Sequence, residues 1–170
     1  MLLRHGSNMA IADVDLRVCK PFKDFGRGFY LTAIEVQAEL MARRTSRIFS
    51  GIPTVTTFSL NEKALIDSSL SIKTFEAPTL EWAMFVLNNR NKSFTDFSNE
   101  NSNHDNKYDI VIGPVANDDI ALLLGTYTRG YIDGEALLRG LTYRVLSDQY
   151  SFHTEDAIKL LKREGAKVYE

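Results

Sequence analysis

Pro21-Phe-Lys-Asp-Phe-Gly-Arg-Gly-Phe-Tyr-Leu-Thr32 is the stretch that says most about the fold. Two glycines, Gly26 and Gly28, flank Arg27 and lead directly into the aromatic, strand-like run Phe29-Tyr-Leu31. Glycine permits positive φ and lets the main chain approach another surface closely. A basic, aromatic loop that becomes a strand and then a helix suits the wall of a ligand cleft. A tight turn before an ordinary core strand explains the same residues.

A helix is predicted directly after this stretch. Thr32-Ala-Ile-Glu35 has the spacing of a capping box, and the helix would run to about Phe49, where Gly51 ends it. Its buried positions are expected to include Val36, Leu40, Ile48 and Phe49. Its solvated positions are expected to include Arg43, Arg44 and Arg47.

Composition indicates one globular domain spanning residues 1–170. The chain has 20 basic and 22 acidic side chains, so its formal net charge is −2. This near balance gives no global electrostatic case for binding nucleic acid or a membrane. The single Cys19 excludes an intramolecular disulfide and a multi-cysteine zinc site, and we expect no metal. No run reaches transmembrane length and residues 1–6 lack the apolar core of a signal peptide, so we expect a cytoplasmic protein.

The rest of the chain mixes short strands and helices without a repeat or a strict βαβ order, which indicates an α+β domain. Strands are predicted at 1–4, 54–60, 71–75, 108–115, 141–146 and 149–153, the last two compatible with a hairpin across 147–148. Helices are predicted at 80–88, at 120–124 after the cap Asn117, at 133–139, and from the cap Thr154 to Lys162. Residues 89–107, rich in Asn, Ser, Asp and Lys, are expected to form a polar surface loop that is partly disordered.

Three separated segments carry residue types that are used in chemistry. His5-Gly-Ser7 ends the first strand, Gly26-Arg-Gly-Phe-Tyr30 begins the second, and Asp148-Gln-Tyr-Ser-Phe-His153 lies on a late strand. This order resembles the ADP-ribosyltransferase superfamily, in particular the diphtheria-toxin and poly(ADP-ribose) polymerase branch with its His-Tyr-Glu triad. The chain is also similar to small uncharacterised bacterial proteins assigned to that superfamily, which share Phe-Lys-Asp-Phe-Gly-x-Gly-Phe-Tyr and Tyr-Asp-Ile-Val-Ile-Gly-Pro-Val-Ala-Asn-Asp-Asp.

The resemblance implies two split, mixed β-sheets around a cleft for NAD as substrate, with flanking helices. It implies that His5 hydrogen-bonds a ribose hydroxyl and that Gly6 offers main-chain groups to the nicotinamide carboxamide. Ser7 would lie near the ribose or the phosphates, and Tyr30 would stack on the nicotinamide ring. His5, Tyr30 and Gln149 would be the catalytic set. Residue by residue there is a plainer interpretation: a structural histidine, a turn serine and a core tyrosine.

The segment 17–23 would form a lid over NAD. Arg27 or Lys20 would then meet the pyrophosphate, with Gly28 in the wall of the same cleft, although lid charges are usually solvated. The relatives place a second tyrosine on the following helix, and the corresponding residues here are Leu40 and Met41. An apolar side chain could still cover the nicotinamide ring.

The catalytic glutamate of the relatives falls on Gln149. Breaking the bond between nicotinamide and ribose builds positive charge on the ribose, and a nearby carboxylate stabilises that charge more in the transition state than in the ground state. Gln149 can hydrogen-bond the ribose but supplies no charge, so polymer synthesis is not expected and single transfer is in question. Glu155 suits the positive end of a helix better than a substitute catalytic role.

Other polar residues leave alternatives open. Asn117, Asp118 and Asp119 either cap a helix or contact the acceptor at the cleft rim. His153 shares a strand face with Gln149 by two-residue alternation, so it could line the cleft, whereas His104 in the polar loop looks incidental.

The leading prediction is an NAD-dependent mono-ADP-ribosyltransferase that passes ADP-ribose to a protein or nucleic-acid acceptor. The resemblance alone adds the setting of an intracellular bacterial toxin with a neighbouring antidote (antitoxin) protein. Rival predictions are a catalytically weak module that holds NAD or ADP-ribose, an RNA phosphate transferase of the same superfamily, and a structural interaction protein.

Overall fold

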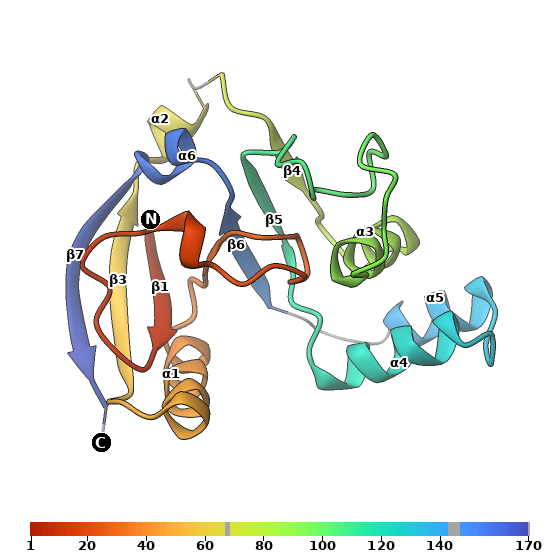
Figure 1. Cartoon of the computed structure of the whole chain (residues 1–170), viewed down its shortest axis with the longest axis horizontal. Helices are drawn as coiled ribbons and strands as arrows, with labels where there is room; N and C mark the ends of the chain where they lie inside the picture. Colours follow the sequence, from red (N-terminus) through yellow and green to blue (C-terminus); the bar gives the residue numbers. More distant parts are fainter. Residues whose placement is uncertain (67–68, 143–146, 170) are drawn as a thin grey trace.

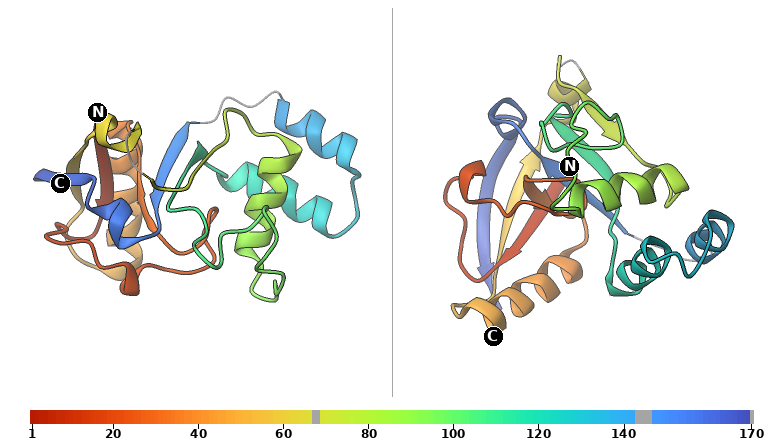
Figure 2. Two further views of the ribbon diagram at one scale, coloured as in Figure 1. Left: turned by 90° about the horizontal axis from the view of Figure 1, so that it is seen from above. Right: turned by 45° about the vertical axis from the view of Figure 1, so that its right-hand side comes forward.

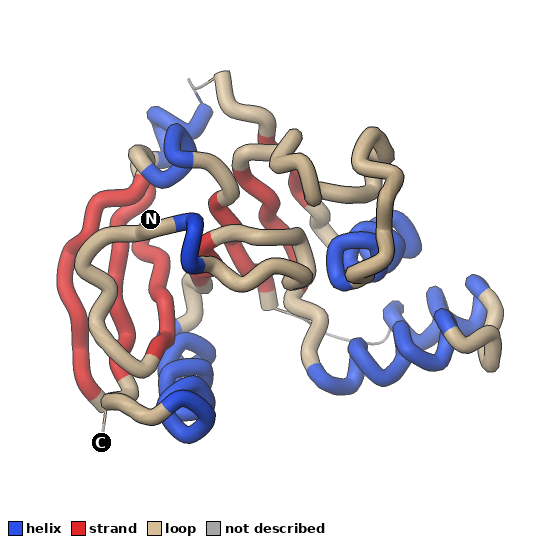
Figure 3. The backbone as a smooth tube through the Cα atoms, viewed as in Figure 1, coloured by secondary structure: helices blue, strands red, loops and turns tan. Residues whose placement is uncertain are grey.

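The computed structural model describes residues 1–66, 69–142 and 147–169, which form two β-sheets with helices around them (Figures 1 and 3). The first sheet is antiparallel, in the order β1 (Leu2–Ser7), β3 (Thr54–Leu60), β7 (Leu161–Val168). The second has the order β2 (Phe29–Leu31), β6 (Asp148–Phe152), β5 (Ile110–Pro114), β4 (Ile72–Thr74). It is mixed, because β4 and β5 run parallel. The predicted α+β class is confirmed.

The helical elements of this part are η1 (Leu16–Val18), α1 (Glu35–Phe49), α2 (Glu62–Ile66), α3 (Leu80–Arg90), α4 (Asp118–Thr128), α5 (Gly134–Thr142) and α6 (Glu155–Ile158). Two predicted caps are confirmed: the side chain of Asn117 accepts from Ile120 N, and that of Thr154 accepts from Ala157 N. No described helix combines the length and the apolar character needed to cross a bilayer.

The second sheet lies between the first sheet and the helices α3, α4 and α5, as the view from above shows (Figure 2, left). Because successive strand residues point to opposite faces, each of its faces builds its own core. Phe29, Leu31 and Phe152 pack with Leu3 and Phe58 of the first sheet. The opposite face packs on a second cluster, which includes Phe25, Phe75, Trp82, Phe85, Val111, Ile120, Leu124, Leu137 and Leu141.

Helix α1 lies against β1 with small residues, and the predicted buried positions are wrong. Ala38 and Ala42 are buried, because the helix approaches the strand at Gly6 too closely for larger side chains. The four predicted core residues are instead exposed: Val36, Leu40, Ile48 and Phe49. The predicted capping box is also wrong, because the cap residue is Ile34, which has no side-chain bond to the helix. Thr32 Oγ1 instead accepts from Ile34 N and donates to Gln37 Oε1.

The C-terminal region departs most from expectation. The helix predicted to reach Lys162 ends at Ile158, and Leu161–Val168 forms β7 along the whole length of β3. The strand predicted at 141–146 is wrong where it can be checked, because residues 141 and 142 end α5, where Leu141 is fully buried. Residues 143–146, and the hairpin expected there, lie outside the described residues.

Of the loop predicted at 89–107, residues 89 and 90 instead end α3, and 91–107 contain no helix or strand, as predicted. This stretch has more anchors than its composition suggests. Ser102 and Asn103 are fully buried. Asn103 N donates to Asn89 Oδ1 at 2.8 Å, and Asn103 Nδ2 donates to Tyr108 O at 3.1 Å. His104 is part of this structure, because its ring stacks on Phe94 at 5.7 Å between centroids.

Candidate functional site

His5 is held by the main chain of the strand that carries Tyr30. Its Nδ1 lies 2.8 Å from the carbonyl O of Tyr30, and since a carbonyl only accepts, Nδ1 carries the proton and donates. The ring lies 4.6 Å from the Phe29 ring, and burial lowers the pKa of His5 below its ordinary value. The imidazole is therefore neutral at pH 7, and its Nε2 is an acceptor to which no described residue donates.

Gly6 turns its peptide groups toward the edge of β1 that faces β2. Arg4 N donates to Thr32 O at 2.8 Å and Thr32 N donates to Arg4 O at 2.9 Å, which makes an isolated bridge. In an antiparallel strand both peptide groups of a residue point to one edge, and alternate residues share that edge. The N–H and C=O of Gly6 therefore point away from β3, on the same edge as those of Arg4 and two residues past the Arg4–Thr32 bridge.

The absence of a side chain at Gly6 also has a packing reason. A Cβ added there would lie 1.9 Å from the carbonyl O of Ala38 in α1. Only glycine lets the helix approach the strand this closely. The position therefore serves the fold whatever else it does.

Tyr30 points to the opposite face of β2 from Phe29 and fastens the preceding loop. Its hydroxyl donates to Gly26 O at 2.8 Å and accepts from Phe25 N at 3.0 Å. The ring lies 6.5 Å from the Phe25 ring and 6.3 Å from that of His153. Burial, and then the charge of Asp24, raise the pKa of Tyr30 well above its ordinary value, so the phenol stays protonated.

Gln149 is only 9% exposed, and its side-chain amide donates to the Oδ2 of Asp24 at 2.8 Å. Asp24 is itself buried and accepts from Arg90 Nε at 3.0 Å, Arg90 Nη2 at 2.7 Å and Ala116 N at 3.0 Å. Asp24 belongs to the stretch 21–32, but the sequence alone predicts no role for it. The available signal was a carboxylate inside an apolar stretch bounded by glycine, where a buried acid needs partners.

His153 is confirmed on the same strand face as Gln149, and it is buried. Its Nδ1 lies 2.7 Å from Arg27 O, and its Nε2 lies 2.8 Å from Ser151 Oγ, which also contacts Val111 O at 2.9 Å. A Cβ at Gly28 would approach the His153 ring to 2.7 Å. Gly28 thus makes room for this imidazole.

The side chains of the residues predicted for the phosphates make contacts outside this network. Ser7 Oγ donates to Asn8 Oδ1 at 3.3 Å. Arg27 is exposed, and its Nη1 donates to Arg17 O at 3.3 Å. Lys20 Nζ lies 3.9 Å from the ring centroid of Phe49, at the end of α1.

The remaining candidates have local roles. Asn117 caps α4, and Asp118 lies 3.9 Å from Arg44 of α1. Leu40 and Met41 are exposed on α1, and Glu155 is in the first turn of α6.

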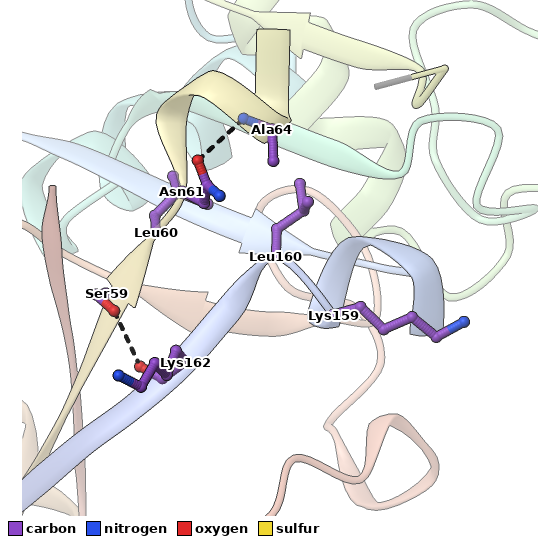
Figure 4. A pocket seen from close by; sticks show the side chains of 7 residues that line it. All are labelled: Ser59, Leu60, Asn61, Ala64, Lys159, Leu160 and Lys162. Carbon is purple, nitrogen blue, oxygen red and sulfur yellow. Dashed lines mark hydrogen bonds between the residues drawn. The ribbon is translucent and has the colours of Figure 1, made fainter. Parts of the chain in front are cut away.

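Two surface pockets are lined by residues outside the three segments. One, of about 350 Å³, lies between the ends of β3 and β7 and contains Lys159 and Lys162 (Figure 4). Lys159 Nζ is 2.7 Å from Asp156 Oδ1 and Lys162 Nζ is 3.9 Å from Glu164 Oε1, so both cations already have acidic partners. The second pocket lies beside Asn8 and Gly51. Neither is lined by His5, Gly6, Tyr30 or Gln149. Within the described residues, no group of three or more His, Cys, Asp or Glu side chains could hold a metal ion.

Comparison with known proteins places the chain in a family whose function is unknown. A family model described as "Protein of unknown function (DUF3990)" matches residues 1–163. The chain belongs to this family. No curated protein and no solved structure matches the chain. Membership in the family therefore assigns no role to His5, Tyr30 or Gln149.

Proposed function

We propose that the chain is an NAD-dependent mono-ADP-ribosyltransferase whose nicotinamide site is the edge of β1 at His5 and Gly6. The supporting observation is the set of polar groups at this edge: one N–H, one C=O and one imidazole acceptor. A carboxamide has one acceptor and one donor, which match the two peptide groups of Gly6. A ribose hydroxyl can donate to Nε2 of His5, whose Nδ1 is occupied by Tyr30 O.

The reaction itself is a substitution at the ribose carbon that carries nicotinamide. The bond from this carbon to the nicotinamide nitrogen breaks, and nicotinamide leaves with the electron pair as a neutral molecule. The acceptor nucleophile, on a protein or a nucleic acid, bonds to the same carbon and gives up a proton. In this proposal His5 orients the ribose and Gly6 orients the leaving group, so both act by positioning.

A second candidate is a module that holds NAD or ADP-ribose with little turnover. It is favoured by the site's lack of an available carboxylate, because Gln149 is uncharged and the charge of Asp24 is paired with Arg90. Since electrostatic stabilisation of the developing charge is usually the largest catalytic term, its loss would lower the rate more than the affinity. A bacterial toxin acting in the cytoplasm beside an antidote protein is the biological setting that goes with the first candidate.

One assay separates the two candidates. Purified protein is incubated with NAD, and both NAD binding and nicotinamide release are measured, for the wild type, for His5→Ala and for the control His104→Ala in the 91–107 loop. Release that His5→Ala abolishes and His104→Ala retains supports the transferase. Binding without release, weakened by His5→Ala, supports the module. No binding by the wild type would refute both.

A further inference from the structure

Asp24 is a buried carboxylate that accepts four hydrogen bonds from three residues. Its Oδ1 accepts both bonds from Arg90, and its Oδ2 accepts from the peptide N–H of Ala116 and from the side chain of Gln149. An ionised carboxylate has no hydrogen to give. Every group that bonds this carboxylate must therefore present an N–H. Among these groups, only the side-chain amide of Gln149 could present either a donor (NH₂) or an acceptor (Oε1).

The amide of Gln149 has two ends of nearly the same shape, and Asp24 decides which end faces it. Only the NH₂ end can bond a carboxylate, so Oε1 must point the other way. No described residue donates to this Oε1, and Oε1 is not one of the described side-chain atoms that are both fully buried and without a partner. Among the described residues, a side chain that is nine-tenths buried thus keeps one polar atom to which no group donates.

We infer that Asp24 is a positioning residue that makes Gln149 an obligatory hydrogen-bond acceptor for a ribose hydroxyl of NAD. This inference rests on the proposed function. Asp24 holds the NH₂ end, so the ligand meets the carbonyl oxygen and must offer a donor. Donation to a carboxylate also polarises the amide and makes Oε1 a stronger acceptor.

The same geometry gives a physical reason for glutamine at a position where the transferases that the sequence resembles have glutamate. A glutamate at 149 would bring a second carboxylate oxygen to the place of Nε2, 2.8 Å from Asp24 Oδ2. Two carboxylates at that distance cannot both stay ionised, and the pair would hold one proton between them. Gln149→Glu by itself therefore does not give the site a usable charge.

Binding of NAD is compared with binding of analogues that lack the 2′- or the 3′-hydroxyl of the nicotinamide ribose. We expect the wild type to prefer NAD to one of the two analogues by roughly tenfold, the value of a good hydrogen bond. In Asp24→Asn the amide of residue 149 is free to reverse, and this preference disappears. Gln149→Leu removes it as well, whereas Asp96→Asn, at an exposed position of the 91–107 loop, retains it. A merely structural role of Asp24 would weaken NAD and analogue equally and leave their ratio unchanged, which would overturn the inference.

A second measurement does not depend on NAD. The side-chain NH₂ hydrogens of Gln149 are followed by ¹H–¹⁵N spectroscopy in the free protein. We expect them to exchange slowly with water in the wild type and quickly in Asp24→Asn. Fast exchange in the wild type contradicts the orienting role even if NAD binds. Slow exchange without any NAD binding supports the orientation and instead refutes the proposed function.

Discussion

Among single residues, His153 has the environment that should depend most strongly on pH. Burial lowers the pKa of its imidazole to about 4, although its bond to Arg27 O and the charge of Asp109 oppose that shift. Between about pH 6.5 and pH 4 the unfolded chain binds a proton here that the folded chain does not bind. Stability is therefore complete above pH 6.5 and falls as the pH drops, by about 3 kcal/mol at most.

This expectation is checked by urea unfolding between pH 7 and pH 4.5. Burial shifts the pKa of His5 in the same direction, so its contribution adds to the slope. His153→Gln should flatten the pH dependence while it keeps a polar group near Arg27 O. A slope that is the same in His153→Gln and in the wild type would contradict the assignment.

Arg90 is the residue on which the charge of Asp24 depends. Arg90→Met removes two bonds to Asp24 and one to Ala116 O, and leaves a buried carboxylate without its cation. We expect the free energy of unfolding to fall by about 3 kcal/mol, as measured in urea. Lys159→Met, which breaks an exposed ion pair with Asp156, serves as the control and should change nothing measurable. Equal effects of the two variants would contradict a central role for Asp24.

Local sequence could not predict these pairings. Asp24 meets its donors from positions 90, 116 and 149, which lie on α3, after β5 and on β6. A pattern of neighbouring residues carries no information about such distant partners. The alternation of Gln149 and His153 on one strand face was predictable, because it depends only on the period of a strand.

At the scale of elements, α1 shows how a close approach replaces the usual apolar face. Leu40 is 62% exposed and Val36 63%, whereas Ala38 faces β1. We expect Leu40→Glu to change stability by less than about 0.5 kcal/mol. Ala38→Leu should destabilise by about 2 kcal/mol, because added volume must displace the helix from the strand. Thermal unfolding of the two variants checks this, and a larger loss in Leu40→Glu would contradict the packing described.

The error in α1 and the error in β7 have different causes. In α1, the apolar periodicity predicts that the large apolar residues are buried. It carries no information about the close approach of β1 at Gly6, which leaves room on the helix only for alanine. In β7, most side chains are exposed and no apolar alternation marks a strand. The segment becomes a strand because it pairs with β3. Tertiary context thus overrides the local preference.

For the whole molecule, the class of fold could be predicted and the sheet order could not. Strands at 54–60 and 110–114 and the caps Asn117 and Thr154 follow from local chemistry. The division into two sheets depends on which distant strands pair, as when β1 takes β3 as its neighbour and touches the end of β2 through a single bridge. That bridge leaves the Gly6 edge beside His5, which is the centre of the proposed site.

The most direct test of that site is a ¹H–¹⁵N titration of the full chain with NAD. We predict a saturable shift of the Gly6 amide, from a hydrogen bond to the carboxamide, together with a shift of His5 Nε2. Shifts confined to other regions, such as the pocket at Lys159 and Lys162, or no shift at Gly6 and His5 at saturating NAD, would contradict the proposal.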